Sequence, residues 1–364
     1  MIMAVQPGDL SRVHAAVRLL TGDAPTNGGR ASFPVQKFES GVPGSYWPAT
    51  LQRELTAGKS MIQKHFLHCT PVDNSALADP KFYFFDLLKK ENVVDANTYS
   101  YFFLGTHDDT GANNGEATAD KYGIGELKTE VTAGGTYSFT LDFYHDELVD
   151  GALTGGDAAA IKTGYYVILE ARDTAGGAGN FEVIGPITVT GLSGTEVTFT
   201  TAAPATLSYA IGARGCTLPT GLDDLQATVN SVDKTGLSGG ASTFDETLVE
   251  VYSSIPRMDL TLTVEAGALT YSAANDVTGW SSGGSMGGGI SISADKLFAN
   301  EDPSYVRDII KIPANTFNGT IAAGDVVILY LYPSMLPVWQ RVVIKPGAAS
   351  GTAVIKTLDT GETV

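Results

Sequence analysis

The sequence predicts a mainly β protein of antiparallel β-sandwich or jelly-roll-like units, with an N-terminal helix and an extended arm. Glycine supplies 42 of the 364 residues and charged residues only 17%, a composition typical of strands and turns. From Thr129 onward, short β-branched and aromatic runs are separated by Gly, Asn or Pro. Among them, Met258–Glu265 alternates strictly between apolar and polar residues, which predicts a half-buried strand. Several such runs at close spacing indicate an antiparallel sandwich or barrel.

The chain is longer than one ordinary domain, so two or three compact units are expected. Changes in composition place the boundaries after residues 128 and 275. Residues 1–128 hold the helix, the arm and an aromatic mixed region, and residues 129–275 form an antiparallel β-sandwich domain. Residues 276–364 hold a Gly-rich loop and a C-terminal β-meander, which either completes the sandwich or forms a separate unit.

The N-terminal region combines helical and extended patterns. Asp9–Leu20 has the spacing of an amphipathic helix with Asp9 as its cap. A second short helix is predicted within Leu51–His68. Between them, Ala24–Pro48 is rich in Gly, Pro and Ser and predicts an extended arm that covers either a neighbouring subunit or its own domain. Its candidate interface residues are Phe33, Phe38, Tyr46 and Trp47.

Two aromatic runs, Phe82–Leu88 and Tyr99–Leu104, predict strands on either side of a polar turn. Consecutive side chains on a strand point to opposite faces, so these rings favour core or interface positions over a single sugar-stacking platform. Phe82 and Phe84 are therefore further interface candidates.

Two segments contain possible metal ligands. His65, His68 and Cys69 lie close together, but no matching second cluster accompanies them, as a structural zinc site requires. His107–Asp120 is rich in oxygen ligands but lacks the acidic spacing of an EF-hand loop, so a solvated loop is favoured and calcium binding stays open. We expect no metal, no cofactor and two free thiols, at Cys69 and Cys216.

The C-terminal region has the highest density of β-forming residues. Val306–Ile312, Asp325–Tyr332 and Val338–Ile344 predict a meander, separated from the central strands by the Gly-rich loop Trp280–Gly289. Asp325–Tyr332 is apolar at nearly every position, which predicts a strand covered on both faces, within a sandwich or at a subunit interface. Tyr330, Tyr332 and Trp339 complete the interface candidates.

Charge and motifs argue against several function classes. A formal net charge of −17 opposes binding to a phosphate backbone, so direct nucleic-acid binding is not expected. The sequence lacks nucleophile elbows, zinc-protease motifs and nucleotide fingerprints, so we expect no enzymatic activity and no catalytic residues. A glycosidase dyad stays open at three adjacent carboxylate pairs, namely Asp108 and Asp109, Asp146 and Glu147, and Asp223 and Asp224.

The chain shows neither a signal peptide nor an apolar run long enough to span a membrane. A soluble protein made in the cytoplasm, without a membrane partner, is therefore expected.

A closing pattern follows the aromatic arm, the Gly- and Thr-rich strands and the Gly-rich loop. It consists of Gly324-Asp325, Leu331-Tyr332-Pro333, Leu336-Pro337-Val338-Trp339, Val342-Val343 and Pro346-Gly347-Ala348. With these features the chain resembles virion structural proteins of tailed bacteriophages, most of all a head decoration (cement) protein or a minor capsid protein.

The resemblance implies a non-enzymatic protein of the virion, made in the host cytoplasm, that stabilises the capsid by contacts with itself and with the major capsid protein. It also implies a homo-oligomer, with a homotrimer favoured because capsid lattices offer three-fold positions. The alternatives are a tail, baseplate or fibre component, and a carbohydrate-binding β-sandwich module.

Overall fold

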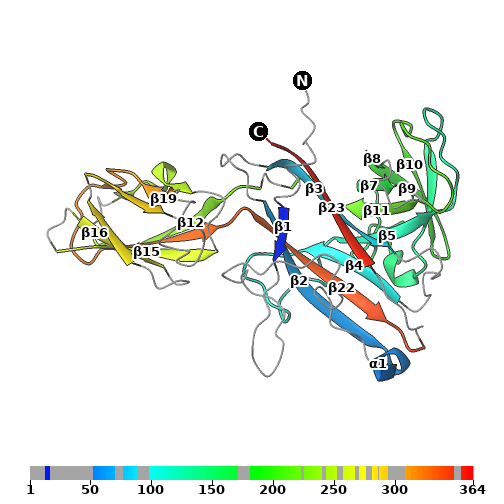
Figure 1. Ribbon diagram of the computed structural model, residues 1–364, viewed down its shortest axis with the longest axis horizontal. Coiled ribbons are helices and arrows are strands. Elements are labelled where there is room, and N and C mark those ends of the chain that lie inside the picture. The colour runs from blue at the N-terminus through cyan, green and yellow to red at the C-terminus, as the bar shows by residue number, and fades with distance from the viewer. Residues whose placement is uncertain are drawn as a thin grey trace.

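The computed structural model confirms the predicted mainly β, antiparallel fold. The residues that it describes are 13–16, 52–69, 77–87, 98–170, 181–222, 225–239, 243–251, 257–266, 270–275, 281–285, 287–293, 308–347 and 354–363. Strand pairs among these residues are antiparallel, and they form two lobes joined at a narrow waist (Figure 1).

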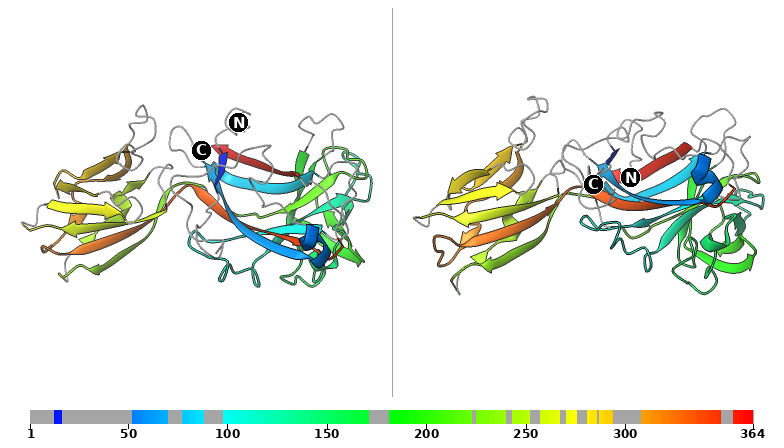
Figure 2. Two further views of the ribbon diagram at one scale, coloured as in Figure 1. Left: turned by 60° about the horizontal axis from the view of Figure 1, so that its bottom comes forward. Right: turned by 90° about the horizontal axis from the view of Figure 1, so that it is seen from below.

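The large lobe is built on a sheet whose main path runs β1-β2-β22-β4-β5-β11-β7-β8, with β6, β10 and β9 added beside β5. These strands are β1 (Val13–Ala16), β2 (Lys59–Cys69), β4 (Thr98–Leu104), β5 (Lys121–Leu127), β6 (Ser138–Asp142), β7 (Tyr166–Glu170), β8 (Phe181–Ile184), β9 (Ile187–Ser193), β10 (Glu196–Thr201), β11 (Arg214–Leu218) and β22 (Met335–Ile344). A ribbon of β3 (Leu77–Leu87) and β23 (Val354–Thr363) crosses one face of the sheet, where β3 contacts β5 and β11 (Figure 2).

Helices are short in the described chain. The large lobe contains α1 (Gln52–Ala57), within the segment predicted to hold a second short helix, and the 3-10 helix η2 (Asp146–Leu148). The small lobe contains the 3-10 helix η3 (Glu246–Leu248).

The small lobe pairs a five-stranded sheet, ordered β12-β21-β15-β16-β17, with the smaller sheets β14-β19-β18 and β13-β20. Its strands are β12 (Thr228–Gly236), β13 (Thr243–Phe244), β14 (Glu250–Val251), β15 (Met258–Val264), β16 (Thr270–Asn275), β17 (Ser281–Ser285), β18 (Ile290–Ser293), β19 (Asp308–Ile312), β20 (Phe317–Asn318) and β21 (Val326–Tyr332). β17 lies inside the Gly-rich segment that the sequence predicted as a loop, because its backbone pairs with β16 despite its poor strand composition.

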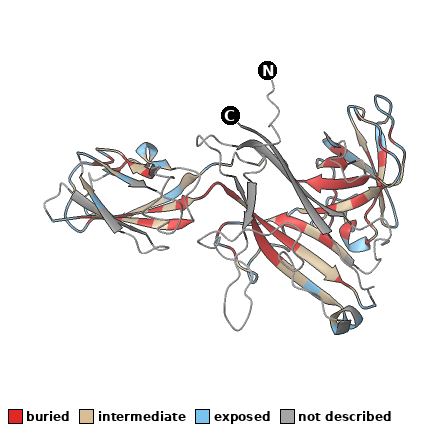
Figure 3. Ribbon diagram, viewed as in Figure 1, coloured by how far each residue is buried: buried red, intermediate tan, exposed pale blue. Residues whose placement is uncertain are grey.

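Buried apolar side chains form two separate clusters, one in each lobe (Figure 3). In the large lobe Phe139 and Phe199 stack across β6 and β10 with ring centroids 5.4 Å apart. In the small lobe β15 buries every second residue, as its alternating sequence predicted, because successive side chains on a strand point to opposite faces. Full burial of each large apolar side chain contributes about 1.5–3 kcal/mol.

β21 is covered on one face rather than two. Val327, Leu329 and Leu331 are buried against the core of the small lobe. The alternate residues Val326, Ile328, Tyr330 and Tyr332 are half-buried on the outer face. The continuous apolar run therefore leaves an apolar stripe outside the core. The strand is not covered on both faces within the sandwich, and cover of the second face at a subunit interface stays a prediction.

The three C-terminal strands predicted as a meander pair with other strands instead of with one another. β19 pairs with β14 and β18, β21 with β12 and β15, and β22 with β2 and β4. The large sheet thus takes strands from residues 1–128, 129–275 and 276–364 alike. Partner choice depends on long-range packing, which a local strand pattern does not encode.

The N-terminal predictions fall largely outside the described residues. Within the predicted helix Asp9–Leu20, the described part Val13–Ala16 is strand β1, antiparallel to β2. The Ala24–Pro48 arm, with its candidates Phe33, Phe38, Tyr46 and Trp47, lies outside.

Candidate functional site

The chain crosses between the lobes twice within the described residues. The first crossing follows β11, and the second joins β21 to β22 through Pro333 and Ser334. The backbone N–H of Met335 donates a 2.7 Å hydrogen bond to the carbonyl oxygen of Pro333, whose ring fixes its own φ angle. The second crossing is therefore short and restrained.

A buried ion pair between Lys64 on β2 and Asp109 in the loop after β4 lies beside this crossing. The two side chains are 1% and 8% exposed. The Lys64 ammonium also donates to the backbone oxygens of His107 (3.2 Å) and Asp109 (3.1 Å), and it lies 5.0 and 5.7 Å from the ring centroids of Phe66 and Trp339. A buried charge is tolerated only when it is paired and hydrogen-bonded. Lys64 therefore has a structural role.

Asp109 also binds two N–H donors. Its Oδ2 accepts hydrogen bonds from the indole Nε1–H of Trp339 and from the backbone N–H of Thr106, both at 2.9 Å. Gly105 leaves room for this approach, since a Cβ there would lie 2.6 Å from the indole and 2.7 Å from the carboxylate. One carboxylate thus fixes the loop against β2 and β22.

Arg257, directly before β15, connects the small lobe to the same loop. Its guanidinium is 5% exposed and donates to Asp108 Oδ2 through Nε (3.2 Å) and Nη2 (3.0 Å), and to Asp259 through Nη1. The guanidinium carbon lies 4.8 Å from the ring centroid of Tyr332 and 5.9 Å from that of Tyr330. The contact with Asp108 spans the two lobes and restrains their relative orientation.

His107 packs between aromatic side chains of both lobes. Its ring centroid lies 4.5 Å from that of Tyr332 and 6.2 Å from that of Phe66. Burial, and then the positive charge of Lys64, lower the pKa of His107 to about 4. The imidazole is therefore neutral at neutral pH and acts as an aromatic packing residue.

Each carboxylate of the His107–Asp120 loop pairs with a cation of the chain. The pairs are Asp108–Arg257, Asp109–Lys64, Glu116–Arg341 and Asp120–Lys162. Burial opposes the charge of Glu116, but hydrogen bonds from Arg341 and Tyr101 outweigh it and hold the pKa of Glu116 below its ordinary value. Calcium would have to displace these cations, so the geometry favours a charge-pairing loop. Among the described residues, no group of three or more His, Cys, Asp or Glu side chains is arranged to hold a metal ion.

The predicted interface residues occupy three different environments. Tyr330 and Tyr332 are half-buried on the outer face of β21. Trp339 is completely buried inside the large lobe, so in this conformation it has no surface to offer a partner. Phe82 and Phe84 lie on β3, which pairs with β23.

Of the carboxylate pairs considered as a glycosidase dyad, Asp108 and Asp109 are divided between different partners. Asp108 and Asp109 bind different cations, and Glu147 pairs with Lys345 at 2.9 Å. Residues 223–224 lie outside the described chain. Cys216 is completely buried in the core of the large lobe.

Sequence reasoning missed Lys64 and Arg257, the two cations that hold the junction. The available signal was a single lysine inside the strand-like run MIQKHF and an arginine directly before an alternating strand. A charge in such a position needs a buried partner. The partners lie far away in the chain, so the pattern alone could not identify them.

The chain matches no protein-family model, no curated protein and no solved structure. Within the described ranges, no helix is long and apolar enough to cross a membrane.

Proposed function

We propose that this chain is a virion structural protein of a tailed bacteriophage that decorates and stabilises the capsid through contacts between subunits, without catalysis. The observation that carries the proposal is the junction, where charges and aromatic rings hold two β lobes in one orientation. A protein that bridges neighbouring subunits benefits from such rigidity, because ordering a flexible joint on binding costs conformational entropy.

The outer face of β21 supplies a surface for these contacts. Val326, Ile328, Tyr330 and Tyr332 form a half-buried stripe, and threonines of β15 lie beside it in register. An apolar stripe with a polar border resembles the core and rim of a protein interface. We propose a homotrimer, since capsid lattices offer three-fold positions, with the major capsid protein as the second partner.

The test combines light scattering of the purified chain with binding to capsids that lack it. We expect a stable oligomer, and added thermal stability of the capsids that bind it. Ile328→Asp puts a charge in the stripe and should abolish assembly. Leu248→Asp, at an exposed apolar residue of the same lobe, should leave assembly intact.

Circular dichroism of both variants separates loss of assembly from loss of folding. A wild-type chain that stays monomeric at high concentration and ignores capsids contradicts the proposal. Binding to host cells instead of capsids would favour a tail or fibre component.

A further inference from the structure

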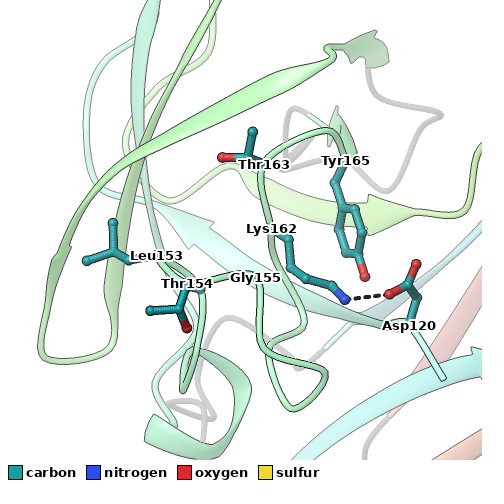
Figure 4. A pocket seen from close by; sticks show the side chains of 8 residues that line it. Asp120, Leu153, Thr154, Gly155, Lys162, Thr163 and Tyr165 are labelled. Atoms are coloured by element: carbon teal, nitrogen blue, oxygen red, sulfur yellow. Dashed lines mark hydrogen bonds and ion pairs between the residues drawn. The ribbon is translucent and has the colours of Figure 1, made fainter. Parts of the chain in front are cut away.

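The large lobe contains a pocket that shares no residue with the β21 stripe. Its volume is about 380 Å³, within the roughly 300–1,000 Å³ range of small-molecule sites. Its walls come from the end of the charge-pairing loop, from the turn after η2 and from the segment before β7 (Figure 4). The lining residues are Asp120, Ala152, Leu153, Thr154, Gly155, Lys162, Thr163 and Tyr165.

Two polar residues of this pocket are nine-tenths buried or more, and the side chain of Lys162 alone is 11% exposed. Lys162 is 8% exposed and forms an ion pair with Asp120 (Figure 4). Tyr165 is 9% exposed, and its hydroxyl points toward this pair but makes no hydrogen bond among the described residues. A buried hydroxyl without a partner is unfavourable, and a ligand that hydrogen-bonds to it removes that cost.

Neighbouring groups hold the Tyr165 phenol in place and protonated. Its ring stacks on Tyr122 with centroids 5.2 Å apart, and the Lys162 ammonium lies 5.6 Å from its centroid. Burial, and then the neighbouring Tyr122 and Asp120, raise the pKa of Tyr165 above its ordinary value. The hydroxyl therefore stays protonated across the neutral pH range.

The charges in the pocket disfavour ionic ligands. The Lys162 ammonium stands between Asp120 and Asp157, whose carboxylate lies 3.8 Å away, so its charge is already matched. An anion would meet these carboxylates, and a metal cation would meet the ammonium, at short range in both cases. The arrangement suits a neutral ligand that both donates and accepts hydrogen bonds.

We propose that this pocket binds one sugar residue of a neutral carbohydrate. Each hydroxyl of a pyranose is both a donor and an acceptor, which matches the Tyr165 phenol, the Asp120 carboxylate and the Lys162 ammonium. The apolar C–H face of the sugar would contact Leu153, which is 55% exposed and lines the same pocket.

The test titrates the full chain with methyl β-D-glucopyranoside, methyl β-D-galactopyranoside and methyl α-D-mannopyranoside, followed by saturation-transfer difference NMR. We expect at least one glycoside to bind. Tyr165→Phe removes only the hydroxyl and should weaken binding about 3- to 10-fold, and Asp120→Asn should act likewise. Tyr209→Phe is the matched control, since it removes another buried hydroxyl without a partner, outside the pocket, and should leave binding unchanged.

Failure of all three glycosides to bind overturns the proposal, as does binding that Tyr165→Phe and Asp120→Asn leave intact. Displacement of a bound glycoside by inorganic phosphate or Ca²⁺ would contradict the neutral ligand class. Thermal unfolding checks that the variants fold; the Asp120 side chain is 54% exposed, so its replacement should spare the core. The variants do not touch the β21 stripe, so the result is independent of the proposed assembly.

Discussion

Lys64 and Arg257 show how this acidic chain accommodates buried charge at the scale of single residues. Each cation is nearly inaccessible, ion-paired with aspartate and packed against aromatic rings. Pairing in a dry interior returns little net stability, because desolvation opposes the attraction, but loss of one partner leaves a charge without compensation. These pairs therefore act mainly as restraints on geometry.

Removal of the Asp109 carboxylate should destabilise the protein strongly. Asp109→Leu leaves the Lys64 ammonium buried without its partner, so we expect a loss of about 3–5 kcal/mol in the free energy of unfolding, measured by chemical denaturation. The double variant Lys64→Met/Asp109→Leu should recover much of this loss. Glu54→Gln, which breaks a pair that is about one quarter exposed, should cost only about 0–1 kcal/mol. Equal losses for Asp109→Leu and Glu54→Gln would refute the assignment.

His107 makes the junction sensitive to acid. Its pKa is lowered to about 4, and burial lowers the pKa of His65 to about 3, whereas both titrate near 6.5 in the unfolded chain. Below about pH 6.5 the unfolded chain binds protons that the folded chain excludes, so the free energy of unfolding falls as the pH drops toward 4. His107→Phe should reduce this dependence in urea denaturation series between about pH 7 and pH 4.5. If the free energy of unfolding depends on pH equally in the wild type and in His107→Phe, His107 does not contribute to the acid sensitivity.

At the scale of elements, β21 and β22 are consecutive in sequence but belong to different sheets. β21 lies between β12 and β15 in the small lobe, and β22 lies between β2 and β4 in the large lobe. The two residues between them cannot absorb much rotation. The loop after β4 packs against this crossing, and its position depends on close contact at Gly105.

A methyl group at Gly105 should displace that loop. Gly105→Ala drives a Cβ into the indole of Trp339 and the carboxylate of Asp109, and we expect a loss of about 1–3 kcal/mol together with altered tryptophan fluorescence. Gly135→Ala is the control, because the nearest atom to its added Cβ is 3.9 Å away. If thermal unfolding finds both variants equally stable, the close contact at Gly105 is not a constraint.

At the scale of the whole molecule, two hydrophobic cores are connected by a small set of polar and aromatic contacts. Each lobe buries its own apolar residues, so neither requires the other to complete a core. Their relative orientation depends on the short crossing and on the cluster of Asp108, Arg257, His107 and Tyr332.

Loss of the guanidinium at Arg257 should allow the two lobes to move relative to each other, while the hydrophobic core of each lobe stays folded. For Arg257→Gln we expect a broader distance distribution in small-angle X-ray scattering and a loss of about 1.5–3 kcal/mol in stability, the range for hydrogen bonds to charged groups. Lys234→Gln, which breaks an exposed ion pair within the small lobe, is the control. A scattering profile like that of the wild type would show that Arg257 is not required to orient the lobes.

The sequence by itself determined the features that depend on local periodicity. Alternation in Met258–Val264 predicted which face of β15 is buried, and the density of short β-branched runs predicted a mainly β, antiparallel protein. It also singled out Tyr330, Tyr332, Trp339 and the loop that begins at His107. These predictions were accessible because side-chain direction on a strand follows from the backbone repeat alone.

Only the tertiary structure decided how those residues meet. Trp339 donates a hydrogen bond to Asp109, and the rings of Tyr332 and His107 are in tilted contact. β22 pairs with β2 instead of with β21, its neighbour in sequence. Each of these contacts joins residues far apart in the chain. Their stability comes from mutual burial and charge pairing, which exist only once distant strands have been brought together, so no local pattern can specify them.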